Sequence, residues 1–213
     1  MYIIRRIVAI SKILKLNGCK KRKGKEIMTE KEKVQNGFMY NQNYDAELIQ
    51  ERTNAQDICF AYNQTKPSDI EKRTKILKGL LKNTKGNFLI EQPFFCDYGY
   101  NITIGENFYA NHNLVILDAT EITIGDNVFI GPNCGIYAAG HPINIKERNE
   151  GLEYAKKIKI GDNVWIGGNV TILPGVTIGD NVTIGAGSVV TKDIPSNVIA
   201  YGNPCRVVRQ TQE

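Results

Sequence analysis

The sequence predicts a mainly β fold, a parallel β-helix preceded by a small helical unit, from two periodic patterns. From Ile160 to Val190, isoleucine or valine recurs at every sixth residue. This period fits neither the turn of an α-helix nor simple strand alternation, and it is typical of hexapeptide repeats whose short strands wind around a prism. A second pattern, Ile-Gly-Asp/Glu-Asn, recurs at 104–107, 124–127, 160–163 and 178–181. The last two copies begin eighteen residues apart, so three hexads should form one coil, with adjacent coils ~4.8 Å apart.

The columns of the repeat predict a buried wall with tight corners. The rows begin with Ile160, Ile166, Ile172, Ile178, Ile184 and Val190, and the fifth column holds Val164, Val170, Val176, Val182 and Ser188. Branched side chains suit a pleated buried surface, whereas glycines and Asp-Asn pairs suit corners that need positive φ. We therefore expect these residues to build structure, and the function to lie where the repeat breaks. The breaks are a frame shift between Ile116 and Ile124 and a charged excursion over 142–157.

The chain begins with a basic extension, residues 1–27. Nine Lys or Arg and no acid occur in residues 1–25, within a chain whose net charge is +5. Lys12 breaks the apolar run well short of the ~20 residues that cross a bilayer, and no small-residue cleavage site precedes the basic run 20–25. We expect a disordered extension without a stable membrane anchor, with an amphipathic helix lying on a surface as the alternative.

Three further regions follow this extension. They are a helical unit over 28–85, the β-helix over 86–200 and a C-terminal tail over 201–213. Thr29 and Glu32 form a capping box at the start of the first expected helix, and Asp45 precedes apolar residues at helical spacing. Ser68 with Glu71 predicts the start of another helix. The helical unit is too short for a large core of its own, so we expect it to pack on the prism.

The cysteines indicate neither a disulfide framework nor a zinc site. They are Cys19, Cys59, Cys96, Cys134 and Cys205, which are scattered, odd in number and without C-x-x-C spacing. A reducing cytoplasm is the simplest setting for such a chain.

The two histidines, His112 and His141, limit the chemistry. A hydratase that holds zinc with three histidines cannot be built from one subunit, and no serine is placed for a Ser-His-Asp triad. His141 lies in Gly-His-Pro, where the hexads stop and the excursion starts. An imidazole on such a loop suits a general base, and a structural hydrogen bond is the alternative. We expect His112 to be a surface or interface residue.

Several segments together resemble the maltose and galactoside O-acetyltransferases. They are Asn107–Asn111, Ile116–Asp118, Gly140–Pro142, Ile160–Gly167, Pro174–Asp180, Gly185–Ser188 and Gly202–Arg206. The resemblance runs from about Met28 to Arg209 and is nearer the maltose branch because of segments 44–48 and 67–72. It implies a left-handed β-helix, a homotrimer with active sites between subunits, and acetyl-CoA as acyl donor with no metal.

The resemblance also implies roles for individual residues. His141 would be the catalytic base that deprotonates a sugar hydroxyl, and the Gly168 N–H a candidate oxyanion donor. Acceptor contacts fall on Asp45, Asp97, Tyr109, Asn111 and Asp118, and cofactor contacts on Gly168, Ala186, Thr191, Lys192, Arg206 and Arg209. Lys192, Arg206 and Arg209 suit the phosphates of coenzyme A. Trp165 would serve either an interface or the cofactor.

These observations predict a CoA-dependent O-acetyltransferase that acts on a maltose- or glucose-type sugar. A galactoside or an oligosaccharide is the alternative acceptor. From a different class, a non-catalytic β-helix could serve as a scaffold for partners. Nucleic-acid binding rests only on the basic residues 1–25, which lack the interleaved aromatic residues of such sites, so we expect no nucleic-acid partner.

Overall fold

The computed structural model describes residues 28–211, which divide into two compact units. The first unit holds residues 28–51 and 141–154, and the second holds residues 52–140 and 155–211. The expected disorder of residues 1–27 falls outside the described residues. The units do not follow the boundaries expected from the sequence. The excursion groups with the N-terminal residues, and most of the expected helical unit groups with the β-helix.

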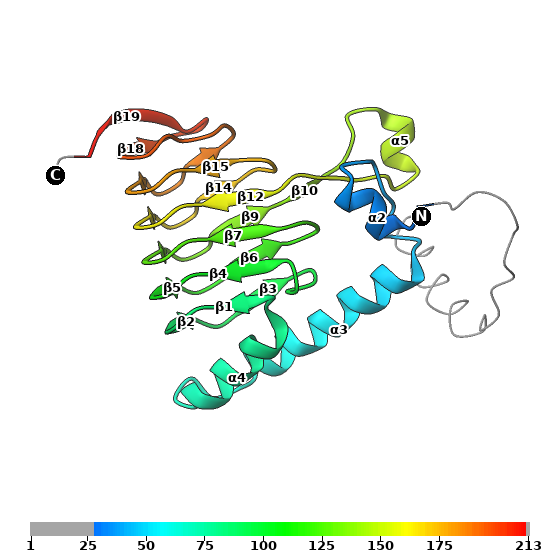
Figure 1. The fold of residues 1–213 in the computed structure, drawn as a ribbon, viewed down its shortest axis with the longest axis horizontal. Coiled ribbons are helices and arrows are strands. Elements are labelled where there is room, and N and C mark those ends of the chain that lie inside the picture. The colour runs from blue at the N-terminus through cyan, green and yellow to red at the C-terminus, as the bar shows by residue number, and fades with distance from the viewer. Residues whose placement is uncertain (1–27, 212–213) are drawn as a thin grey trace, which may run out of the picture. The chain divides into compact units, whose positions relative to one another are not determined.

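The second unit is a three-sided solenoid of short parallel strands, which confirms the mainly β prediction (Figure 1). The first face contains β1 (Asn83–Thr84), β4 (Ile102–Ile104), β7 (Ile122–Ile124), β12 (Ile158–Ile160) and β15 (Thr177–Ile178). The second face contains β2 (Phe88–Ile90), β5 (Phe108–Ala110), β8 (Phe129–Ile130), β13 (Trp165–Ile166), β16 (Thr183–Ile184), β18 (Val198–Tyr201) and β19 (Arg206–Gln210). The third face contains β3 (Phe94–Cys96), β6 (Leu114–Leu117), β9 (Gly135–Tyr137), β14 (Thr171–Ile172) and β17 (Val189–Val190). The excursion is flanked by β10 (Ala139–Gly140) and β11 (Tyr154–Ala155).

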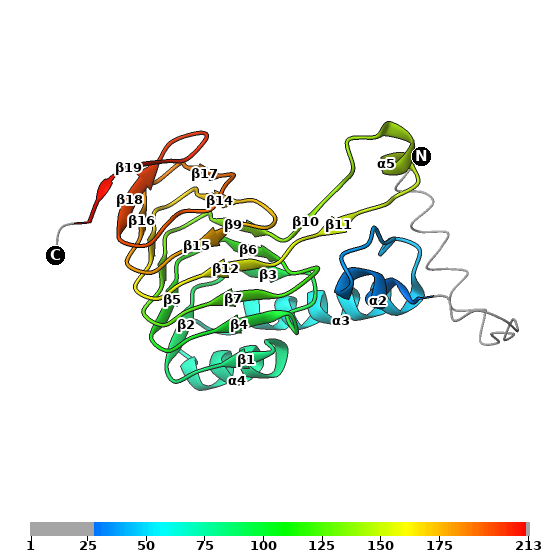
Figure 2. The same ribbon diagram turned by 45° about the horizontal axis from the view of Figure 1, so that its top comes forward.

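The wall columns stack in register through the solenoid, as Figure 2 shows for β4, β7 and β12. Ile124 pairs with Ile160, and Ile160 pairs with Ile178 in the next coil. The row heads Ile160 to Val190 and the fifth-column residues Val164 to Ser188 are all buried, with at most 2% of any of them exposed. The predicted buried wall is therefore confirmed, and it forms the apolar core of the second unit.

The corners between the first and second faces use asparagine and glycine in different ways. Asn163 and Asn181 both have φ of 57°, and the Asn163 amide donates to Asn181 Oδ1 at 3.1 Å. Gly161 and Gly179 at these corners do not have positive φ, whereas Gly175 and Gly187 at other corners of the repeat do, with φ of 88° and 73°, so the prediction that glycines supply this conformation holds only at some corners. A Cβ on Gly161 would instead lie 2.2 Å from Asp180 Oδ1 and 2.8 Å from the Gly179 carbonyl carbon. Glycine is required there because the next coil approaches closely.

The outer surfaces of the faces differ in character. The outward residues of the first face are polar: Thr103, Thr123, Lys159 and Thr177. On the second face Tyr109 pairs with Phe129, and Phe129 pairs with Trp165. Phe129 is 43% exposed and Trp165 is 59% exposed. The second face thus presents a row of aromatic side chains, which is the kind of surface that protein interfaces cover.

Helices close one end of the second unit. α3 (Ala46–Asn63) begins in the first unit, and the boundary between the units falls within it. Its later residues Cys59 and Tyr62, with Leu77 of α4 (Ile70–Leu80), join the apolar core of the solenoid. The N-cap of α4 is Asp69, which accepts a hydrogen bond from Lys72 N at 3.2 Å, and not the predicted Ser68. The C-terminal tail contains β19, which pairs antiparallel with β18.

The first unit is built from two chain segments. Its helix α2 (Glu30–Gln35) has the predicted capping box, in which Glu32 N donates to Thr29 Oγ1 at 3.2 Å and Thr29 N donates to Glu32 Oε2 at 2.7 Å. The excursion contributes α5 (Ile145–Asn149), which Asn144 caps. A β-bridge joins Tyr40 to Glu153 and ties the two segments together. Within residues 28–211, no helix has the length and apolar character needed to cross a membrane.

Candidate active site

His141 lies in the first unit, at the start of the excursion, and 47% of its side chain is exposed. Its Nδ1 lies 3.0 Å from the Leu152 carbonyl oxygen, and its Nε2 lies 3.8 Å from Glu153 Oε1. A carbonyl oxygen can only accept, so Nδ1 carries the hydrogen and Nε2 keeps its lone pair in the neutral imidazole. Nε2 is therefore in the form that can take a proton from a hydroxyl group.

Glu153 is the buried carboxylate beside this imidazole. Only 4% of the residue is exposed. Its Oε1 accepts from Asn43 Nδ2 at 3.1 Å, and its Oε2 accepts from Tyr40 OH at 3.2 Å and from Gln42 Nε2 at 2.5 Å. Three donors thus fix both oxygens of Glu153 within the first unit, with Oε1 facing His141.

Asp45 is the other predicted site residue of the first unit. It is half-buried, and its Oδ1 accepts from Leu48 N at 2.9 Å, which makes it a cap for α3. A carboxylate has further acceptor positions beyond this bond, so the cap is compatible with the predicted contact to an acceptor hydroxyl.

Asp97 and Asp118 lie in the second unit, at the edge between the third and first faces. Asp118 is fully buried and accepts from the backbone N–H groups of Asp97, Tyr98 and Asn101 at 3.0, 2.9 and 3.4 Å. Burial raises the pKa of Asp118 to about 7, against the hydrogen bond from Tyr98 and with a further rise from the charge of Asp97. Asp118 therefore holds the turn that presents the half-buried Asp97. Its direct contact with an acceptor stays a prediction.

Tyr109 and Asn111 lie on and just after β5 of the second face, and both are half-buried. Asn111 Oδ1 accepts from His112 N at 2.7 Å. The exposed His112 has its Nδ1 2.6 Å from the Gln92 carbonyl oxygen, which fits the predicted surface role. Within the second unit, Asp97 and Asp118 thus lie at the edge between the third and first faces. Tyr109 lies on the second face, and Asn111 lies at the edge between the second and third faces.

The predicted cofactor residues are also separated. Gly168 and Ala186 stack in adjacent coils at the edge between the second and third faces, where Gly187 N donates to Gly168 O at 2.9 Å. Thr191 and Lys192 follow β17, at the edge that also carries Asp97. Arg206 and Arg209 are exposed on β19. Gly168 is half-buried, and the other predicted cofactor residues are solvent-exposed.

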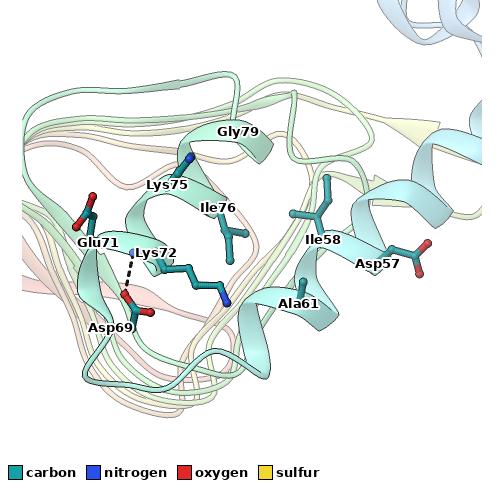
Figure 3. A pocket seen from close by; sticks show the side chains of 9 residues that line it. All are labelled: Asp57, Ile58, Ala61, Asp69, Glu71, Lys72, Lys75, Ile76 and Gly79. Carbon is teal, nitrogen blue, oxygen red and sulfur yellow. Dashed lines mark hydrogen bonds between the residues drawn. The ribbon is translucent and has the colours of Figure 1, made fainter.

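A groove of about 900 Å³ lies between α3 and α4 of the second unit (Figure 3). Its apolar floor includes Ile58 and Ile76, and its rim carries Asp57, Lys72 and Lys75. None of the predicted site residues lines it. Among the described residues, 28–211, no group of three or more His, Cys, Asp or Glu side chains is arranged to hold a metal ion.

Comparison with known sequences identifies the family. The maltose acetyltransferase hexapeptide capping motif matches residues 33–86, the bacterial transferase hexapeptide (six repeats) matches 157–192, and the hexapeptide repeat of succinyl-transferase matches 121–147. The galactoside O-acetyltransferase of Escherichia coli is 45% identical over 166 residues, which make up 78% of this chain and 82% of the relative. The chain belongs to the maltose and galactoside O-acetyltransferase family.

Solved structures of this family have the same fold. A maltose O-acetyltransferase from Clostridium difficile superimposes with a TM-score of 0.85 at 53% identity, covering 87% of this chain and 99% of that one. A galactoside acetyltransferase in complex with coenzyme A superimposes with a TM-score of 0.84 at 45% identity, covering 87% of this chain and 92% of that one. The resemblance to this acetyltransferase family is therefore confirmed.

Sequence reasoning missed Glu153 and the three residues that hold it. Tyr40 and Glu153 are separated by 113 positions, so no local pattern connects them. The polar run 40–43 and the interruption of the hexads were the available signals, and neither specifies a partner.

Proposed function

We propose that this chain is a CoA-dependent O-acetyltransferase that moves acetyl from acetyl-CoA to a hydroxyl group of a maltose- or glucose-type sugar. The family supports the acetyl transfer, and the galactoside relative with bound coenzyme A supports the donor. The observation that carries the proposal is His141, a half-exposed side chain whose Nδ1–H donates to Leu152 O and whose Nε2 keeps a lone pair. No metal takes part in the proposed reaction.

The proposed reaction is direct transfer within a ternary complex. Nε2 of His141 takes the proton of the sugar hydroxyl as its oxygen attacks the thioester carbonyl carbon. The tetrahedral oxyanion is stabilised by a hydrogen-bond donor, for which the Gly168 N–H is our candidate. The carbon–sulfur bond then breaks, the imidazolium returns its proton to the leaving thiolate, and the products are the acetyl sugar and CoA. Asp45, Asp97, Tyr109, Asn111 and Asp118 are the proposed acceptor contacts.

The proposed function is tested by the release of CoA thiol from acetyl-CoA in the presence of separate sugars. We expect the largest kcat/KM with glucose or maltose. A larger value with galactosides or oligosaccharides would favour the alternative acceptors. If no sugar in the panel gave thiol release, a non-catalytic scaffold would explain the protein better than an acetyltransferase.

The expected setting of the protein is the cytoplasm, because the scattered cysteines suit a reducing compartment.

We further propose a homotrimer in which neighbouring chains share each site. Two features of the second unit support this assembly. Its second face carries the exposed aromatic pair Phe129 and Trp165, and the predicted cofactor residues lie at separate edges of the prism. Sedimentation should give about three times the monomer mass. A monomer with full activity at the assay concentration would contradict the shared site.

Arg206 is proposed to bind a phosphate of CoA. Its NH1 donates to Cys205 O at 2.8 Å, which uses one of the five N–H donors of an exposed guanidinium. Arg206→Ala should weaken CoA binding by roughly 1.5–3 kcal/mol, the loss expected for a hydrogen bond to a charged group, and leave the acceptor KM nearly unchanged. Calorimetry measures the affinity, and added salt should weaken wild-type binding more than that of the variant.

Two controls accompany this variant. Lys159→Ala removes an exposed cation from the outer surface of the first face and should leave CoA affinity near wild type. A short acetyl thioester without the nucleotide has no phosphate for Arg206, so wild type and Arg206→Ala should use it equally. Equal CoA affinity in wild type and Arg206→Ala would show that Arg206 has only a structural role and does not bind a phosphate of CoA.

A further inference from the structure

We propose that Glu153 is the electrostatic partner of His141, and that the N-terminal residues Tyr40, Gln42 and Asn43 are the positioning residues that hold it. This inference rests on the proposed role of His141 as general base. It concerns contacts within the first unit alone, where residues 40–43 meet the end of the excursion.

The two nitrogens of His141 are held in different ways. Leu152 O accepts from Nδ1, which fixes the ring orientation. The adjacent residue of the chain then places its carboxylate oxygen 3.8 Å from Nε2. This distance exceeds that of a hydrogen bond, so Nε2 is not consumed by Glu153 and stays available to a substrate hydroxyl. A negative charge this close still favours the imidazolium that forms when the hydroxyl proton is transferred.

The hydrogen bonds of Glu153 explain why its carboxylate stays where it is. Tyr40 OH, Gln42 Nε2 and Asn43 Nδ2 all donate to it, so both oxygens act as acceptors, as an ionised carboxylate requires. Three neutral donors satisfy the oxygens of this buried carboxyl group without placing a cation beside it. Salt screens such a buried charge less than it screens an exposed one. The segment 40–43 therefore takes part in catalysis through the orientation of Glu153, in addition to its structural role.

Among the acidic residues of the excursion, Glu153 is the one whose carboxylate lies close to His141 Nε2. Glu153 Oε1 lies 3.8 Å from His141 Nε2, and Tyr40 OH donates to Glu153 in turn. Glu147 and Glu150 belong to the same excursion, and neither forms a salt bridge with His141 in the described part of the chain. Glu150 is exposed, which makes Glu150→Gln a matched control for Glu153→Gln.

The experiment follows the imidazole directly by NMR, because the sequence has only two histidines. A His112→Asn background leaves His141 as the single imidazole signal. In that background and at one fixed pH, Glu153→Gln should shift the ring-nitrogen signals of His141, because it removes the carboxylate 3.8 Å from Nε2, whereas Glu150→Gln should leave them unchanged. Unchanged His141 signals in a folded Glu153→Gln protein would overturn the proposal.

Kinetics provide the second measurement. Glu153→Gln should lower kcat by about 10–100-fold with acetyl-CoA affinity unchanged. Tyr40→Phe removes one donor and should lower kcat by about 3–10-fold with little change in KM. If Glu153→Gln does not fold, Tyr40→Phe decides, and wild-type kcat in that variant would overturn the role of the segment.

Failure of this inference differs from failure of the proposed function. Acetyl transfer that depends on His141 but is indifferent to Glu153 and Tyr40 would overturn the inference and leave the function. A shifted His141 ring signal in Glu153→Gln, together with a wild-type protein that releases no thiol with any sugar, would confirm the pairing and overturn the proposed function.

Discussion

His141→Ala is expected to lower kcat by roughly 10²–10⁴-fold while the affinity for acetyl-CoA stays near that of the wild type. The reason is that Nε2 acts on the acceptor proton, whereas Nδ1 is occupied by the Leu152 carbonyl oxygen. Thiol release measures kcat, and calorimetry measures the affinity for acetyl-CoA. The loss should appear in kcat with the acceptor KM little changed, because the imidazole contributes mainly in the transition state.

Two variants separate this role from a structural one. His141→Asn offers an amide that can still donate to Leu152 O but cannot act as a base, so its kcat should fall as far as that of His141→Ala. His112→Ala should reduce kcat much less, because His112 lies on the surface of the solenoid beside Gln92 O. Equal losses in the His112 and His141 variants, with both proteins folded, would show that the general base is wrongly assigned.

The solenoid could be predicted from the sequence because its order is local and repeated. A branched residue at every sixth position determines which side chain enters the wall, whatever the neighbouring coil contains. The role of Gly161 could not be predicted in the same way. Its φ is ordinary, and the constraint is the approach of Asp180 and Gly179 from the next coil. The periodicity of the sequence therefore predicts the coils, whereas the contacts between adjacent coils could be identified only from the structure.

The site could be predicted only in part, because its residues come from distant parts of the chain. His141 was recognisable from its place at the break in the hexads and from the family resemblance. Glu153 had no such signal, since its partners lie more than 100 positions earlier in the sequence. Asp118 is predicted to contact the acceptor, and the structure adds a second role that the sequence does not reveal, because its buried carboxyl group holds the turn that begins at Asp97. Sequence patterns cannot distinguish a carboxylate that binds a ligand from one that organises a turn.

Asp118 should make the stability of the protein depend on pH. Its pKa is raised to about 7 in the folded protein from an ordinary value of 3.8, mainly by burial. Between these two values the folded state binds the proton more tightly than the unfolded state does. The stabilisation is therefore fully present below about pH 4 and is lost as pH rises through about 7, with a total loss of at most about 4 kcal/mol.

Asp118→Asn tests this dependence because an amide stays neutral across the range. Its Oδ1 can still accept from Asp97 N and Tyr98 N, while the weak 3.4 Å contact to Asn101 N is lost. Urea unfolding at fixed protein concentration should show the free energy of unfolding of the variant rising relative to wild type by about 2–4 kcal/mol from pH 4 to pH 8. Asp193→Asn is the matched control, since exposed Asp193 also accepts a backbone N–H, from Thr177 at 2.7 Å, and its difference from wild type should stay flat. If the Asp118→Asn difference were constant with pH, or fell as pH rose, the three N–H donors would outweigh burial and hold Asp118 as an anion.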